Sequence, residues 1–225
     1  MQRAARDLRL VVFDETDVAR GSLVPRIERR VDGTAHGMGG LTRWWRLGAV
    51  MHRLARHADA TSGASSWEQA LGFATTVARE RRARIAELQV WGHGGWGHMG
   101  LGGSRLDREA LAANSSLAAS LDAFRAVLAD DALFWVRCCS AFGATPGRAF
   151  APALAERLSC RVAGHTFIIG GLQSGTHSLG PGDEPTWDRE EGLERRADGP
   201  PIPRDSSLTG PNTLSCLHLG LPRGW

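Results

Sequence analysis

The sequence contains no lysine and no tyrosine, so its 27 basic residues are all arginine. Acidic residues number 24, which leaves a formal net charge of only +3. Because this excess is small and not gathered into a basic tail, we expect no nucleic-acid partner. No apolar stretch after the N-terminal Met1–Asp7 is long enough for a signal peptide or a membrane span. The sequence therefore predicts a cytoplasmic protein without a membrane partner.

Cysteine is also scarce, and its spacing excludes common structural uses. The four cysteines are Cys138, Cys139, Cys160 and Cys216, and no C-x-x-C pair is present. A structural zinc site is therefore not expected, and we predict neither a metal nor a cofactor. Adjacent cysteines rarely bridge each other because the geometry is strained. In a reducing compartment we expect four free thiols, one of which is a candidate nucleophile.

The apolar segments that are present predict an α/β fold. With 225 residues, 42% of them apolar, the chain suits one domain with a sizeable core. Buried strands are predicted at Leu8–Phe13, Ile85–Trp91, Ala132–Cys138, Cys160–Ala163 and Leu214–Leu219. Helical patterns alternate with them, which indicates a three-layer sandwich around a mostly parallel sheet. We expect a single domain over residues 1–225, with its core at about 8–188 and a C-terminal loop and strand at 189–225.

The predicted helices cover residues 42–56, 66–84 and 146–158, with two further segments inside 105–129. Ser66 suits the cap of the second helix, since Gln69 follows three residues later. Three stretches are rich in glycine, proline or charge and are predicted as loops: residues 15–40, 92–103 and 170–212.

Reactive side chains follow two of the predicted strands. In parallel sheets, sites form at the carboxyl ends of strands. One strand leads into His93 and another into Cys139. A cysteine nucleophile needs a base or cation nearby and donors for the oxyanion. His93 suits the base and acid roles, and the backbone N–H groups of Gly94 and Cys139 are the candidate oxyanion donors.

This order of elements resembles caspase-like cysteine peptidases, the group of caspases, metacaspases, gingipains and separase. His93 precedes Cys139 by 46 residues, close to the roughly 50 found in caspases. The chain is also similar to caspase-like domains of large bacterial proteins, through His93–Gly97, Gly100–Gly102, Cys139 and Gly147–Phe150. The resemblance spans about residues 85–187. It implies a bacterial protein with a fold of the caspase-hemoglobinase type, in which His93 is the base and Cys139 the nucleophile.

A second likeness concerns the choice between the adjacent cysteines. Arg137-Cys138-Cys139-Ser140 resembles the metacaspase pattern Asp-Cys-Cys-His-Ser-Gly, in which the second cysteine attacks. Strand alternation agrees, because it places Cys138 and Cys139 on opposite faces. The sequence departs from the family in two ways. The caspase string Gln-Ala-Cys-x-Gly is absent, and the glycine that usually follows the nucleophile comes only at Gly143.

Arg137 is the main candidate for the substrate pocket, since in the resembling families the residue two before the nucleophile lines that pocket. A guanidinium in a partly dry pocket prefers a carboxylate, so we expect an acidic or polar residue before the scissile bond. The alternative is that Arg137 pairs with Asp14 or Asp17 at the end of the first strand. Asp14, Trp96 and Trp187 are the other pocket candidates.

The resemblance implies a cysteine endopeptidase that acts on a protein or peptide substrate and is controlled by a separate regulatory protein partner. Two alternatives stay open. One is a catalytically silent caspase-like module that binds a partner. The other is an α/β-hydrolase-type esterase, because Val90–Trp96 resembles the oxyanion motif of lipases, although the Gly-x-Ser-x-Gly elbow of that fold is absent. A metal site formed by His93 and His98 lacks further ligands in the sequence around it.

Overall fold

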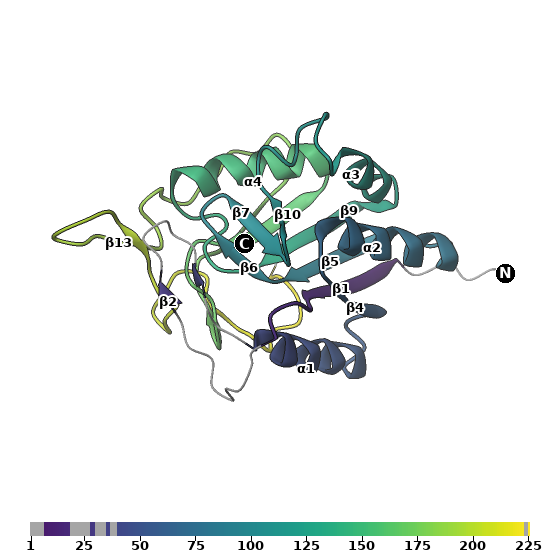
Figure 1. Cartoon of the computed structure of the whole chain (residues 1–225), viewed down its shortest axis with the longest axis horizontal. Coiled ribbons are helices and arrows are strands. Elements are labelled where there is room, and N and C mark those ends of the chain that lie inside the picture. The colour runs from purple at the N-terminus through teal and green to yellow at the C-terminus, as the bar shows by residue number, and fades with distance from the viewer. Residues whose placement is uncertain (1–6, 19–27, 30–34, 37–39, 223–224) are drawn as a thin grey trace.

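The computed structural model describes residues 7–18, 28–29, 35–36, 40–222 and 225. Its centre is a six-stranded sheet with the order β12-β10-β9-β5-β1-β4 (Figure 1). Neighbouring strands are parallel except for β12, which runs antiparallel to β10 at the edge. The strands are β1 (Leu8–Asp14), β4 (Ala60–Ala64), β5 (Ile85–Trp91), β9 (Leu128–Arg137), β10 (Arg161–His165) and β12 (Thr176–Leu179). The predicted α/β class with a mostly parallel sheet is confirmed.

Helices cover both faces of this sheet. In Figure 1, α2 (Trp67–Arg81), α3 (Ala118–Arg125) and α4 (Ala144–Leu158) lie on one side and α1 (Leu41–Leu54) on the other. Successive strand residues point to opposite faces. Val90 and Val136 therefore join the large core under α2, α3 and α4, whereas Trp91 and Trp135 lie on the α1 side. The result is three layers, with the C-terminal segment packed beside α1 against the second face.

The clearest apolar runs became the elements that the sequence predicted. The strand at Ile85–Trp91 has the predicted bounds, and the first strand extends one residue further. Ser66 caps α2, since its hydroxyl accepts a hydrogen bond from the Gln69 backbone N–H at 3.3 Å. The helix ends earlier than predicted, because Arg82 takes a left-handed conformation with φ of 50°.

Several elements differ from the prediction. The glycine-rich stretch is a three-stranded antiparallel sheet, formed by β6 (His93–Gly95), β7 (His98–Leu101) and β8 (Ser104–Leu106), and not a loop. Buried Met99, Leu101 and Leu106 anchor it to the core. The predicted final strand is short and joins a separate pair, β11 (Leu172–Gln173) with β15 (Leu214–Ser215). Most of the predicted loop at 15–40 lies outside the described residues.

The sequence missed β4 and β12 entirely. The β4 segment, ATSGA, has no apolar run that would mark a strand, and β12 lies inside the polar stretch predicted as a loop. Only one helix, α3, forms between residues 105 and 129. The remaining short strands are β2 (Glu28–Arg29), β3 (Ala35–His36), β13 (Leu193–Glu194) and β14 (Ile202–Pro203).

The core on the α2 side depends on aromatic packing around Phe134. This side chain is fully buried, and its ring centroid lies 6.2 Å from that of Trp67 and 5.8 Å from that of Phe124. We expect Phe134→Ala to lower the free energy of unfolding by about 3–5 kcal/mol, as measured by urea denaturation. Val50→Ala, on the exposed side of α1, is the control and should stay within about 0.5 kcal/mol of the wild type. A loss below about 1 kcal/mol for Phe134→Ala would contradict this account of the core.

Candidate functional site

The candidate site lies at the carboxyl ends of β5 and β9. These strands are neighbours, and their last residues, Trp91 and Arg137, face each other in the parallel ladder. The chain therefore delivers His93 and Cys139 to the same edge of the sheet, each two residues beyond its strand end. The strand order therefore places both predicted reactive residues at the edge of the sheet where sites form in parallel sheets.

Gly94 fixes how closely the two loops approach. A Cβ atom on this residue would clash with the sulfur of Cys138 and lie 2.9 Å from the carbonyl oxygen of Cys139. Only glycine leaves room for this contact, so the His-Gly segment packs directly on the backbone of the Cys-Cys segment. Gly94 itself pairs with Met99 in the β6–β7 ladder.

The His93 ring is oriented by a carboxylate. Its Nε2 atom lies 3.1 Å from Oδ2 of Asp17, and the edge of the ring packs against Trp45 at a centroid distance of 5.4 Å. Asp17 also accepts the backbone N–H groups of Gly40 and Leu41 at 3.1 and 3.2 Å, which are otherwise unsatisfied donors at the start of α1. A neutral His93 that donates Nε2–H to Asp17 keeps Nδ1 free to accept a proton.

The Cys139 thiol contacts a backbone carbonyl oxygen. The side chain is half-buried, and its sulfur donates to the carbonyl oxygen of Ile169 at 3.8 Å. Burial raises the pKa of the Cys139 thiol to about 11. The neighbouring Cys138 points into the core on the opposite face, and burial raises its pKa well above the ordinary value. No hydrogen bond between described residues joins the His93 ring to the Cys139 thiol.

The residue after Cys139 takes a left-handed backbone conformation. Ser140 has a φ of 52°, in the left-handed region that favours glycine. Its backbone N–H donates to the carbonyl oxygen of Phe167 at 2.9 Å, which holds the turn in place. Among the described residues, the buried Ser140 hydroxyl has no hydrogen-bond partner. A strained serine therefore lies directly after the candidate nucleophile.

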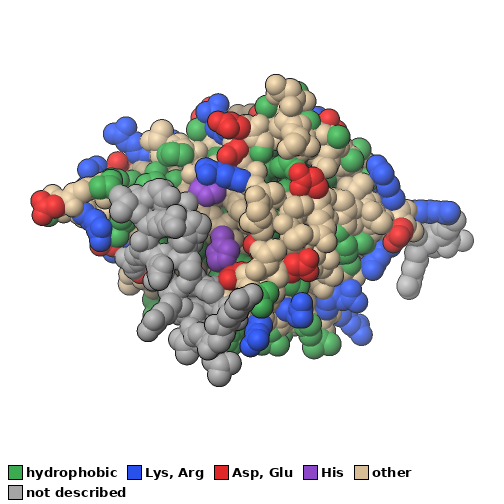
Figure 2. All heavy atoms as spheres, in the orientation of Figure 1, with side chains coloured by type: hydrophobic (Ala, Val, Ile, Leu, Met, Phe, Trp, Pro, Cys, Tyr) green, Lys and Arg blue, Asp and Glu red, His purple; other side chains and the backbone are tan. Residues whose placement is uncertain are grey.

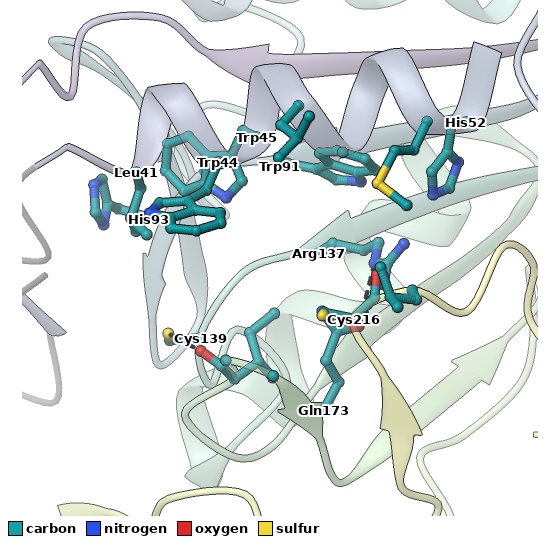
Figure 3. Close-up of a pocket in the computed structure, with 18 of the residues that line it drawn as sticks. Leu41, Trp44, Trp45, His52, Trp91, His93, Arg137, Cys139, Gln173 and Cys216 are labelled. Carbon is teal, nitrogen blue, oxygen red and sulfur yellow. Dashed lines mark hydrogen bonds between the residues drawn. The ribbon is translucent and has the colours of Figure 1, made fainter. Parts of the chain in front are cut away.

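His93 and Cys139 both line a cavity of about 560 Å³ between α1 and the C-terminal segments. Figure 3 shows the two residues toward one end and His52 and Arg137 toward the other. Most of the wall is apolar. Apart from these four, the described lining residues are Leu41, Trp44, Trp45, Leu47, Gly48, Met51, Trp91, Gly92, Ile168, Ile169, Gly170, Gly171, Gln173, Cys216, Leu217 and Leu219.

Arg137 lines the cavity on the same side as Cys139, but the protein already satisfies its guanidinium. Two donors reach Oε1 of Gln173 at 2.7 and 3.2 Å, and a third reaches Oε1 of Gln89 at 2.9 Å. The remaining two reach the carbonyl oxygens of Cys216 and His218 at 3.2 and 3.3 Å. All five N–H donors are therefore in use.

Aromatic rings and neutral acceptors contact Arg137 directly, and the carboxylate of Glu87 interacts with it from beyond Gln89. Its guanidinium carbon lies 4.5 Å from the ring centroid of Trp135 and 5.5 Å from that of Trp91, within cation–π range. Burial lowers the pKa of Arg137 to about 10, so the group stays charged at neutral pH. The predicted alternative of a pair with Asp14 or Asp17 is wrong, because neither carboxylate contacts it.

Three other pocket candidates lie elsewhere. Asp14 is buried, and its carboxylate accepts from the backbone and hydroxyl of Thr16 and from the Gly102 N–H, which ties β1 to the β7–β8 turn. Trp96 sits in the β6–β7 turn against Gly143. Trp187 is buried and stacks on Phe142 with a centroid distance of 5.7 Å. None of the three lines the cavity around Cys139. Asp14 and Trp96 make contacts within turns, and Trp187 packs in the core.

The structure also adds residues that sequence reasoning missed. Asp17 was considered only as an ion-pair partner of Arg137, yet it holds His93. Its position after the end of β1, next to β5 in the sheet, was the available signal. The α1 residues of the cavity wall and Gln173 belong to no sequence motif that would have predicted a place in the site.

Neither a cluster of metal ligands nor a membrane-spanning helix occurs in the part of the chain that the structure describes. There, no three His, Cys, Asp or Glu side chains converge as a metal site requires, and Nδ1 of His98 lies 3.3 Å from the Trp96 carbonyl oxygen. No helix in that part is long and apolar enough to cross a bilayer. Figure 2 shows acidic and basic side chains interspersed over one face, with histidines reaching the surface near its centre.

Comparisons with protein-family models, with curated proteins and with solved structures found no match to this chain. The function therefore has to be argued from the residues and their geometry.

The far end of the cavity contains a buried neutral histidine, which predicts a pH dependence of stability. His52 is only 3% exposed, and burial lowers its pKa from 6.5 to about 4. Between pH 6.5 and pH 4 the imidazole of His52 is protonated in the unfolded chain but not in the folded chain. The free energy of unfolding therefore falls as the pH drops through this range. At pH 4.5 the loss from this residue should be about 2–3 kcal/mol.

Urea denaturation of the wild type and of His52→Phe at pH 7 and pH 4.5 tests this expectation. On acidification the variant should lose about 2–3 kcal/mol less stability than the wild type. Buried His165, whose pKa is lowered to about 3, contributes equally in both proteins and cancels in the comparison. Equal losses in the two proteins would contradict the assignment.

Proposed function

We propose that this chain is a cysteine endopeptidase of the caspase-like type, with Cys139 as nucleophile and His93 as acid and base. One observation carries the proposal: the two residues follow adjacent parallel strands and line the same cavity, with the His93 ring held by Asp17. A fold of the caspase-hemoglobinase type, a cytoplasmic location and control by a regulatory protein partner belong to the same proposal.

The reaction follows from the positions of these groups. As the Cys139 sulfur attacks a peptide carbonyl carbon, its proton passes to Nδ1 of His93. The backbone N–H groups of Cys139 and Gly94 are the candidate donors to the oxyanion. Collapse of the tetrahedral intermediate breaks the C–N bond, and His93 gives the proton to the departing amine. Water, deprotonated by His93, then hydrolyses the thioester and restores the thiol.

The raised pKa of Cys139 decides when the thiol is activated. With a pKa of about 11, only about one thiol in ten thousand is ionised at pH 7. Burial therefore disfavours a thiolate at rest, and in the proposed step the proton moves as the substrate is attacked. The contact between Cys139 and the Ile169 carbonyl is lost in this step.

The same observations favour a second candidate, a catalytically silent caspase-like module that binds a partner. A protonated thiol without a hydrogen bond to His93 is what such a module would retain. The two functions differ in one measurable respect: the peptidase forms a covalent acyl intermediate at Cys139, whereas the module does not.

Substitution of each adjacent cysteine tests the assignment of the nucleophile. Cys139→Ala should abolish cleavage of a peptide library, followed by mass spectrometry of the products, and leave the circular dichroism spectrum unchanged. Cys138→Ala is the matched control, and it should keep its activity while losing about 1 kcal/mol or more of stability, because it leaves a small cavity in the core. Activity in Cys139→Ala, or a folded but inactive Cys138→Ala, would refute the assignment.

Asp17 is expected to act as a positioning residue for His93. Asp17→Asn should lower kcat at least tenfold with little change in KM, because an amide does not hold the same tautomer as firmly as a carboxylate. Asp130→Asn, at a side chain that is 97% exposed, is the control. An unchanged kcat in Asp17→Asn, or an equal change in KM, would leave this residue with a structural role only.

A further inference from the structure

The mouth of the cavity at Cys139 gathers exposed apolar side chains. Trp44, Leu47 and Met51 lie on one stripe of α1, and Leu217 lies on the C-terminal segment. All four line the cavity, although they are 43–62% exposed. Half of the large exposed hydrophobic residues in the described part of the chain are thus concentrated at this opening. Clusters of this kind mark binding sites, since scattered single residues are the norm on a surface.

The polar groups inside the cavity offer little to a charged ligand. All five donors of Arg137 are used by Gln89, Gln173 and two backbone carbonyls. An entering carboxylate would lose its water and find no free donor on Arg137, and the unpartnered ring nitrogens of His52 are buried. No aspartate or glutamate is among the described lining residues, so a lysine or arginine side chain would also lack an ionic partner.

We infer that this cavity binds a large apolar side chain, such as Leu, Met or Phe, on the residue whose carbonyl carbon Cys139 attacks. This inference rests on the proposed peptidase function, and it replaces the acidic preference that the sequence predicted from Arg137. Arg137 instead stabilises the cavity wall, because its donors hydrogen-bond to β5, to β11 and to the C-terminal segment. A volume of about 560 Å³ lies within the usual range for ligand pockets. The apolar wall extends from Cys139 toward His52 (Figure 3).

The first test uses four peptidyl-aminocoumarin substrates that differ only in their last residue: Leu, Phe, Asp or Arg. We expect kcat/KM for Leu or Phe to exceed that for Asp and for Arg at least tenfold. Met51→Glu places a carboxylate at the cavity mouth and should reduce the Leu preference at least fivefold, mainly through KM. Val50→Glu is the matched control, because Val50 is similarly exposed on the same helix and does not line the cavity. A preference for Asp or Arg, or a difference below threefold, overturns the inference.

The second test does not require turnover, so it separates failure of the cavity assignment from failure of the peptidase. In Cys139→Ala, a short peptide ending in Leu should change the tryptophan emission saturably, since Trp44, Trp45 and Trp91 line the cavity. Met51→Glu in this background should weaken binding at least fivefold, and Val50→Glu should not. Saturable binding without cleavage by the wild type would refute the peptidase but keep the cavity assignment. Equal binding of the Asp peptide, or tighter binding of decanoic acid than of the Leu peptide, overturns the inference.

Discussion

The contact of Gly94 with the Cys138–Cys139 backbone is the constraint on which the rest of the site depends. It locks two loops that leave adjacent parallel strands, and it is so close that no side chain fits between them. Cys138 is held in the core on one side of this contact, so Cys139 faces the cavity on the other. Asp17 holds the His93 ring, which lines the same cavity, and it also anchors the start of α1. The position of the His93 ring and the start of α1 thus depend on one carboxylate.

Arg137 is the second organising group. A buried cation without a carboxylate partner is costly unless its donors are all used. Here two glutamine side chains and two backbone carbonyls use them, and two indole rings cover the faces of the guanidinium. The donors connect β9 with β5, with β11 and with residues 216–218. The C-terminal segment is therefore part of the cavity wall, and the Arg137 guanidinium holds that segment in place by hydrogen bonds.

Sequence patterns predicted the elements with a strong local signal. Ile85–Trp91 (IAELQVW) is a mostly apolar segment of strand length, and Ser66 with Gln69 is a local cap. β4 was missed because ATSGA owes its strand state to its pairing with β1 and not to its own composition. The glycine-rich hairpins were missed because glycine density masked the alternation of Met99 and Leu101 with small residues.

In the candidate site too, residues with a local sequence signal could be predicted, whereas contacts between distant residues could not. His93 and Cys139 could be predicted because each follows a recognisable strand. The partners of Arg137 lie 36–81 residues away along the chain, and no local pattern shows which acceptor will reach it. The acidic preference was predicted from its charge alone, and the sequence did not show that neutral groups use every donor. Asp17 lies 76 residues from His93, and only the order of β1 and β5 in the sheet brings them together.

The central claim is that Cys139 forms a covalent acyl intermediate with a peptide substrate. The most direct measurement is the intact mass of the protein after rapid acid quench of its reaction with a Leu-terminated peptide ester, followed by mapping of the modified residue. The account predicts an added acyl group on Cys139, at least tenfold less in His93→Ala. Modification of the exposed Cys216 instead, or an equal yield in His93→Ala, would contradict it.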